Sequence, residues 1–307
     1  MSQGERAGRL VNPYQSCAPW FRANFHGHAH DDASAVDLVQ AYVELGYSIV
    51  GVEPWYLPAV RKRFTDGKVL LVSAPEDGAW PHLIAIAPKE GAGEAGGKPT
   101  TLQARIDAIR GRGADPAGLA FVCHPAWSGI GARELSEVTG YLGIEIYNEA
   151  VQRINGKGRS IETWDTLLGE GKKVWGVATD DAHSIGDLAG RRDVGQGWVV
   201  IQAKSLAEEA VLRALTAGAF YSSMGPEFHS IDLQGDRLTV ATSPCVEVHF
   251  VSAGTGGQSI YAPLGEPRTE FSLDLSSARW LKKYLRIEIL DAQGRTAWSN
   301  PLFPAES

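Results

Sequence analysis

The stretch Asn24-Phe25-His26-Gly27-His28 ends the first predicted strand, which runs over Ala23–His28. Side chains two residues apart lie on the same face of a strand, so His26 and His28 can bind one ion together. Further short apolar runs follow within the first 200 residues, and stretches with helical periodicity lie between several of them. Strands that alternate with helices in this way predict βαβ units, and therefore a parallel sheet or barrel.

The same patterns give the other elements of this α/β region. Strands are expected over Ser48–Val52, Val69–Ala74, Leu83–Ala87, Ala120–Cys123, Gly143–Tyr147, Val174–Ala178 and Trp198–Gln202. Helices are expected over Asp37–Leu45, Leu102–Arg110, Ser160–Leu168 and Ser205–Thr216. Ser205 is expected to be the N-cap of the last helix, with Glu208 completing a capping box.

After Ala217 the sequence changes to alternating apolar and polar residues, separated by turns rich in Gly, Pro and Asp. The strands expected in this part are Ile231–Thr242, Cys245–Ala253, Thr269–Leu275, Leu285–Asp291 and Thr296–Trp298. This pattern predicts a small antiparallel β module. We place the boundary near Met224–Pro226, which divides the chain into an α/β domain of residues 1–224 and a β-rich module of residues 225–307.

Composition and charge exclude several classes of protein. The 307 residues include 29 basic and 36 acidic side chains, so the formal net charge is −7. An acidic chain without a basic run is a poor candidate for coating nucleic acid. No stretch approaches the ~20 apolar residues of a membrane span, and the first residues lack the apolar core of a secretory signal. Three widely spaced cysteines argue against a disulfide scaffold or a zinc ribbon. We therefore expect a cytoplasmic protein that makes no membrane contact.

Three further motifs with metal-ligand side chains follow predicted strands. They are Pro75-Glu76-Asp77-Gly78 with His82 nearby, Cys123-His124-Pro125, and Thr179-Asp180-Asp181-Ala182-His183. Asp181 and His183 repeat the spacing of the first pair, whereas Asp180 points to the opposite face and is the less favoured ligand. Alone, each motif is equally typical of a turn acid or a surface histidine. Together they lie at corresponding strand ends, where parallel α/β folds build their sites.

This set of side chains points to metal-assisted hydrolysis. Imidazole and carboxylate ligands suit zinc, manganese or iron. Two or three such ions would acidify a bound water, so no side-chain nucleophile is expected.

The motifs resemble those of the PHP (polymerase and histidinol phosphatase) superfamily. The first motif is similar to its opening N-L-H-x-H, and Asp181-Ala-His183 is similar to its closing D-x-H. Glu76 and His82 match its middle residues, and His124-Pro125 matches its H-P motif. The tail resembles the β extension of the CehA/McbA-like subgroup, at Gly225-Pro226-Glu227 and in the run that ends Ala297-Trp298-Ser299-Asn300-Pro301.

The resemblance implies a distorted seven-stranded β/α (TIM-like) barrel with phosphoesterase activity and two or three divalent metal ions. In that scheme one ion is held by four side chains: His26, His28, Glu76 and Asp181. Glu76 would bridge to a second ion bound by His82 and His124. His183 would help to hold a third ion.

The sequence departs from the family pattern at one place. The family's second motif normally ends T-D-H, whereas this chain has Glu53-Pro54-Trp55. Tryptophan cannot ligate a metal, so the third site is either empty or rebuilt by other residues: His30, Asp31, Asp32 or Glu53. The sequence therefore predicts two metal ions, with a weak third site if one of these residues replaces the missing ligand.

The expected substrate is a small phosphorylated molecule or nucleotide, and an oligonucleotide is not excluded. Arg191 and Arg192 are expected to bind its phosphate, because the guanidinium fork matches phosphate geometry. Glu145 and Asn148 lie at a strand end, where they could support the site or merely close a turn. Trp55, Trp80 and Trp127 lie near the motifs and could line a pocket. Two alternatives stay open: a carboxyl-ester, carbamate or amide hydrolase using the same ions, and a non-catalytic metal-stabilised domain.

Overall fold

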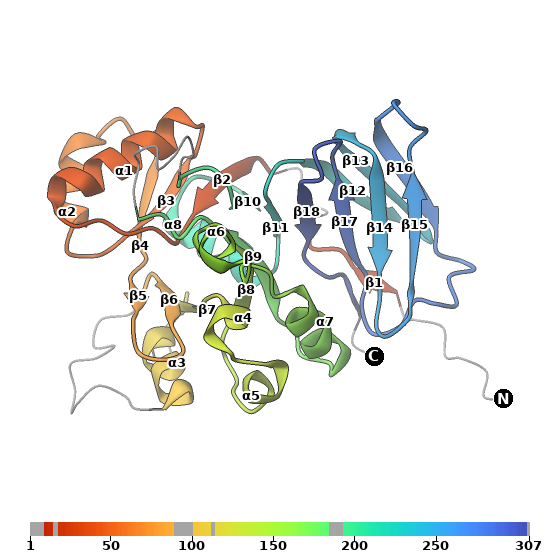
Figure 1. Cartoon of the computed structure of the whole chain (residues 1–307), viewed down its shortest axis with the longest axis horizontal. Helices are drawn as coiled ribbons and strands as arrows, with labels where there is room; N and C mark the ends of the chain where they lie inside the picture. The colour runs from red at the N-terminus through yellow and green to blue at the C-terminus, as the bar shows by residue number, and fades with distance from the viewer. Residues whose placement is uncertain (1–8, 15–17, 89–100, 112–113, 184–192, 306–307) are drawn as a thin grey trace.

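The computed structural model describes residues 9–14, 18–88, 101–111, 114–183 and 193–305. It is a mixed α/β fold whose strands fall into four sheets (Figure 1). Arg191 and Arg192 lie outside the described residues.

The strands of the first 224 residues are β1 (Leu10–Val11), β2 (Trp20–Asn24), β3 (Ile49–Val52), β4 (Leu70–Ser73), β5 (Glu76–Asp77), β6 (Leu83–Ile86), β7 (Leu119–Val122), β8 (Gly143–Asn148), β9 (Trp175–Thr179), β10 (Trp198–Gln202) and β11 (Phe220–Ser223). The helices are α1 (Asp32–Glu44), α2 (Leu57–Arg63), α3 (Leu102–Arg110), α4 (Pro125–Ser128), α5 (Ala132–Ser136), α6 (Glu149–Asn155), α7 (Ile161–Gly169) and α8 (Glu208–Thr216). The later strands are β12 (Phe228–Gln234), β13 (Arg237–Cys245), β14 (Glu247–Val251), β15 (Gly257–Tyr261), β16 (Arg268–Asp274), β17 (Arg286–Leu290), β18 (Thr296–Ser299) and β19 (Phe303–Pro304).

The α/β part of the chain uses two sheets rather than one closed barrel. Strands β2, β3 and β4 are parallel neighbours at one end of a nine-stranded sheet with the order β15-β14-β17-β18-β11-β10-β2-β3-β4. Strands β7, β8 and β9 are parallel neighbours in a five-stranded sheet with the order β5-β6-β7-β8-β9. The parallel βαβ character predicted from the sequence is therefore present, but the seven strands do not join in a single hydrogen-bonded barrel.

The two sheets meet at β9, mainly through side chains and the residues beyond the strand ends. The Ser222 hydroxyl accepts a hydrogen bond from Ala178 N (2.8 Å) and donates one to Gly176 O (2.9 Å). The Asn300 side chain accepts from Gly176 N (3.0 Å) and donates to Phe220 O (2.9 Å). These contacts tie β9 to β11, so the junction does not need a continuous backbone ladder.

The C-terminal strands form a two-layered β structure, seen at the right of Figure 1. The three-stranded sheet β12-β13-β16 shares one hydrophobic core with β14 and β17 of the nine-stranded sheet. Strand β18 pairs with both β17 and β11. The nine-stranded sheet therefore continues across the boundary predicted at residue 224, and the division into two domains stays a prediction.

Several predicted elements need correction. The range Ile231–Thr242 is not one strand, because it lies across the hairpin of β12 and β13. Strand β15 was not predicted, because Gly257–Tyr261 is largely exposed and has little apolar alternation. The Ser205 cap is wrong: α8 begins at Glu208, and its N-cap residue, Ala207, has no side-chain hydrogen bond. None of the described helices is long and apolar enough to cross a membrane.

An ion pair links α7 to the C-terminal strands. Arg286 on β17 is buried, and its Nε and Nη2 each lie 2.7 Å from an oxygen of Asp165 on α7. Tyr284 also donates to Asp165, at 3.0 Å. Arg286 also forms an ion pair with Glu288. Removing Asp165 takes away the bidentate partner of this buried guanidinium, which is more costly than losing an exposed pair.

We expect Asp165→Ala to lower the free energy of unfolding by about 3 kcal/mol, because the Arg286 guanidinium loses its bidentate partner. Urea unfolding followed by tryptophan fluorescence measures the change. Glu209→Ala is the control: it removes an exposed pair with Arg213 and should lower the free energy of unfolding much less. Equal losses in the two variants would contradict the prediction.

Candidate metal centre

Backbone hydrogen bonds beyond the ends of β2 and β9 bring the first and last motifs together. Asp181 N donates to His26 O (3.0 Å), and His28 N donates to Ala182 O (2.7 Å). Because of this alignment, the Nε2 atoms of His26 and His28 each lie 3.1 Å from Asp181 Oδ1. Asp181, more than 150 residues away in the sequence, thus converges on one point with His26 and His28.

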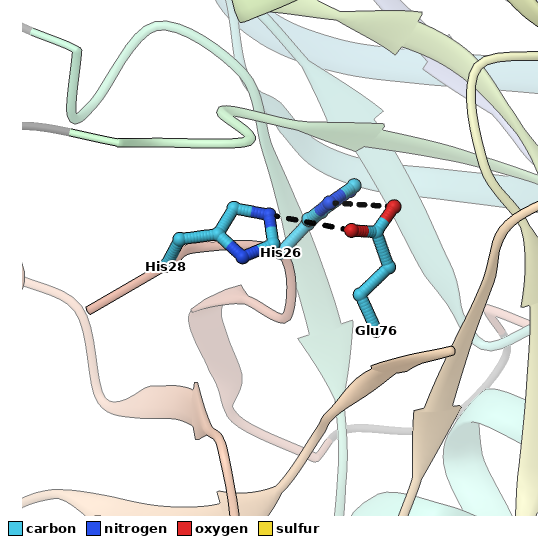
Figure 2. Close-up of side chains that lie close together, drawn as sticks. All are labelled: His26, His28 and Glu76. Atoms are coloured by element: carbon cyan, nitrogen blue, oxygen red, sulfur yellow. Dashed lines mark ion pairs between the residues drawn. The ribbon is translucent and has the colours of Figure 1, made fainter. Parts of the chain in front are cut away.

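Glu76 on β5 of the five-stranded sheet faces His26 and His28, which follow β2 of the nine-stranded sheet. Its two carboxylate oxygens lie 3.6 Å from His26 Nε2 and 3.6 Å from His28 Nε2 (Figure 2). On its other side, Glu76 Oε1 lies 3.6 Å from His124 Nε2 and 2.7 Å from His82 Nδ1. The carboxylate therefore lies between two pairs of imidazoles, which is the arrangement expected of a ligand shared by two ions.

The Nε2 nitrogen of His26 supports a cation at this point. Its Nδ1 lies 2.6 Å from Glu145 Oε1, whereas its buried Nε2 has no hydrogen-bond partner. Two ligand atoms bound about 2.1 Å from one ion at the tetrahedral angle lie about 3.4 Å apart. The observed separations of 3.1 and 3.6 Å from His26 Nε2 to Asp181 and Glu76 fall on either side of this value. The donor set and its spacing fit a divalent metal.

The charges of the cluster point the same way. Burial acts to raise the pKa of Asp181, but His26 and His28 outweigh it and hold that pKa well below its usual value. Burial likewise acts against the charge of Glu76, whose pKa is nevertheless lowered to about 2 by the surrounding histidines. Burial would lower the pKa of His26, and the facing Asp181 and Glu145 instead raise it well above its usual value. The pocket thus favours positive charge, and a metal would displace protons from it.

Glu145 and Asn148 on β8 support the ligands from behind. Glu145 is 1% exposed and accepts from His124 N (2.8 Å), Thr179 Oγ1 (2.8 Å) and Asn148 Nδ2 (2.9 Å). Asn148 Nδ2 also lies 3.1 Å from Asp181 Oδ2, and its side-chain oxygen caps α6 at Val151 N. The sequence left open whether these residues support the site or close a turn, and the structure shows that Asn148 does both.

Asp180 serves the opposite face of the strand end, as its position in the sequence predicts. Its buried carboxylate accepts from three successive backbone N–H groups, at residues 195–197, and from Asn24 Nδ2 and Tyr42 OH. Burial raises the pKa of Asp180 to about 7 against these hydrogen bonds. Asn24 in turn accepts a hydrogen bond from His26 N. Asp180 therefore helps to fix the backbone beside a candidate ligand, a structural role that the sequence did not suggest.

Two of the ligand candidates have left-handed backbone conformations. His124 has φ 31° and Asp181 has φ 52°. For residues with a Cβ such conformations cost on the order of 1–3 kcal/mol each and persist only where the surroundings impose them. Pro125 follows His124 as the first residue of α4, and His124 Nδ1 lies 3.1 Å from Ser128 Oγ. This geometry leaves His124 Nε2 facing Glu76.

The side chains considered for a third site lie at the edge of the cluster. His28, Asp181 and His183 bring ligand atoms within 4.8 Å of one another. His183 is exposed, and its Nδ1 donates to Asp181 O at 2.8 Å, which leaves Nε2 free near His28. Glu53 Oε1 lies 4.0 Å from His28 Nδ1, and burial raises the pKa of Glu53.

His30, Asp31 and Asp32 do not contact the central ligands within the described part of the chain. Asp31 instead caps α1 by accepting from Ser34 N, and Asp32 begins that helix. Their part in a third metal site stays a prediction.

The other sequence candidates are placed as follows. Arg191 and Arg192 lie outside the described residues. Cys123 is fully buried, and burial raises the pKa of its thiol well above the usual value, which disfavours thiolate ligation. Trp55 is exposed beside Tyr56. Trp80 and Trp127 contact His82 and His124.

A solved structure shares this architecture. The crystal structure of a two-domain protein from Bacteroides vulgatus ATCC 8482, which contains a predicted PHP-like metal-dependent phosphoesterase, aligns with a TM-score of 0.53 at 12% identity. The alignment covers 94% of this chain and 96% of that one. The two proteins share a fold. No protein-family model matches the sequence, and no curated protein matches it either.

We expect protein purified without chelator to contain two equivalents of divalent metal, because two ligand groups share Glu76. His26→Ala should retain fewer than one equivalent, while His229→Ala, which changes an exposed histidine on β12, should match the wild type. Elemental analysis by mass spectrometry gives the stoichiometry. A tightly held third equivalent would refute the two-metal prediction.

Glu145→Gln should weaken metal binding by about 10- to 100-fold, because an amide cannot accept hydrogen bonds at both ends and so cannot orient His26 and His124 together. Competition with a fluorescent chelator measures the affinity. Glu170→Gln, on the surface beside Ser136, is the matched control. Unchanged affinity in Glu145→Gln would mean that the ligands are oriented by packing alone.

Proposed function

We propose that the protein is a metal-dependent phosphoesterase of the PHP superfamily, acting on a small phosphate ester or nucleotide. The observation that carries this proposal is the cluster around Glu76: four imidazoles and the Asp181 carboxylate surround it, and the buried His26 Nε2 has no hydrogen-bond partner. The shared fold with a PHP-like protein supports it. The two sheets would then correspond to a distorted barrel with its seam at β9, and the C-terminal strands to the extension of the CehA/McbA-like subgroup.

Two ions of zinc, manganese or iron would each have their own ligands and share Glu76. His26, His28 and Asp181 would hold one ion, and His82 and His124 the other. When bound, the ions would supply Lewis acidity and would lower the pKa of a water molecule near the substrate.

The protein's own groups set the orientation of these ligands. Glu145 accepts from His26 Nδ1, so Nε2 is the nitrogen that remains to bind an ion. His183 donates from Nδ1 to a backbone carbonyl, so its Nε2 is left at the exposed edge of the cluster. That nitrogen would be available to an incoming phosphate, either to bind it or to exchange a proton with it.

A second candidate function is the hydrolysis of a carboxyl ester, carbamate or amide. Within the described part of the chain, no arginine or lysine forms an ion pair with Glu76, Asp181 or Glu145. A phosphate would therefore depend on the ions and on side chains such as Arg191 and Arg192, which are our candidates for binding it. A neutral carbonyl substrate does not need such positively charged side chains.

We expect the Mn²⁺-loaded protein to hydrolyse p-nitrophenyl phosphate. EDTA should abolish turnover because it removes the ions, and Glu76→Gln should abolish it because the shared ligand is lost. The visible absorbance of the released p-nitrophenolate is the readout. Glu170→Gln again serves as the control. Turnover of p-nitrophenyl acetate with none of the phosphate would favour the second candidate, and no turnover of either by metal-loaded protein would refute both.

A further inference from the structure

Trp80 has an unusual position in the loop between β5 and β6. Its side chain is 56% exposed, and it belongs to none of the hydrophobic clusters of the described residues. An exposed tryptophan contributes little to folding, since its large apolar surface stays in water. Its position therefore calls for an explanation other than core packing.

The ring of Trp80 adjoins the ligands of the second ion. Its centroid lies 5.6 Å from that of His82 and 5.7 Å from that of Trp127 on α4. Trp127 packs edge-to-face on His124 at 4.8 Å, and His82 lies 5.3 Å from His124. We call these four side chains the aromatic wall; it continues from the metal ligands to the exposed face of Trp80.

The loop that carries Trp80 is held in place from inside the protein. Arg105 on α3 is 4% exposed, and its Nη2 donates to Ala79 O and Pro81 O, each at 2.7 Å. Its Nε donates to Asp77 Oδ2 at 2.6 Å. The carbonyls on both sides of Trp80 are thus fixed by one buried guanidinium, so the ring is presented on a rigid loop. Such preorganisation reduces the entropy lost when a ligand binds.

We propose that the aromatic wall binds a planar aromatic group of the substrate, so that the preferred substrates are esters of an aryl alcohol or of a nucleoside whose base lies against Trp80. This inference rests on the proposed function for the position of the ester at the ions. The aromatic group itself is recognised by the wall, whichever ester is cleaved. Offset or edge-to-face contact with an indole ring supplies the selectivity.

The test compares aryl with alkyl ligands on the metal-loaded protein. Isothermal titration gives the affinities for phenylphosphonate and methylphosphonate, and for phenylacetate and acetate as carboxylate counterparts. We expect the phenyl compound to bind about tenfold more tightly than the methyl compound, as one aromatic contact allows. Trp80→Ala should remove this preference and leave the methyl compound's affinity unchanged, whereas Trp80→Phe should retain most of it.

Tyr261→Ala is the matched control, because it removes an exposed ring from β15 in the C-terminal part. Thermal melting should show that Trp80→Ala unfolds at the wild-type temperature, since the ring lies outside the core. If the protein prefers the phenyl compound only in the carboxylate pair, the proposal for the aromatic wall is supported and the phosphoesterase assignment is overturned. Three outcomes would overturn the proposal for the aromatic wall. They are equal affinities within both pairs, no binding of the phenyl compound in either pair, and a Trp80→Ala variant that keeps the preference.

Discussion

The carboxylate of Glu145 receives four hydrogen bonds, from groups at the ends of β2, β7, β8 and β9. Its partners are His26 Nδ1, His124 N, Asn148 Nδ2 and Thr179 Oγ1. Although burial acts to raise the pKa of Glu145, the neighbouring histidines lower it overall, so the group is ionised and can only accept. Every partner must then donate, which fixes the proton of His26 on Nδ1 and directs Nε2 towards Asp181 and Glu76. The orientation of His26 and His124 depends on this one buried charge.

Much of the cluster could be predicted because its information is local in the sequence. The i, i+2 spacing of His26 and His28 at a strand end puts both on one face, and Asp181 follows another strand end in the same way. What could not be predicted is set by contacts between distant residues. The clamp from Arg105 to the loop of Trp80 spans 24 to 28 residues, and no local pattern distinguishes that arginine from a solvated one. The same holds for the left-handed backbone at His124, which the structure around it imposes.

The fold was predictable to the same degree and for the same reason. Buried parallel strands such as β3 and β8 are short apolar runs, and the sequence places them to within a residue or two. Strand β15 lies at the edge of its sheet and is mostly exposed, so it carries no such run. The start of α8 was misplaced because a cap depends on the backbone angles before the helix, and here that position is taken by Ala207. The junction between the two sheets depends on Ser222 and Asn300, whose hydrogen-bond partners lie about 45 to 125 residues away in the sequence.

The C-terminal strands take part in holding the site, although none of their side chains belongs to the ligand cluster. Strand β18 pairs with β11, and Trp298 stacks on Tyr147 with ring centroids 6.1 Å apart. Tyr147 lies on β8, between Glu145 and the Asn148 that contacts Asp181. Asn300 accepts from Gly176 on β9, the strand that leads to Asp181. Residues beyond position 224 thus fix both β8, which carries Glu145, and β9, which leads to Asp181. The geometry of the candidate metal centre is therefore a property of the whole chain rather than of its α/β part alone.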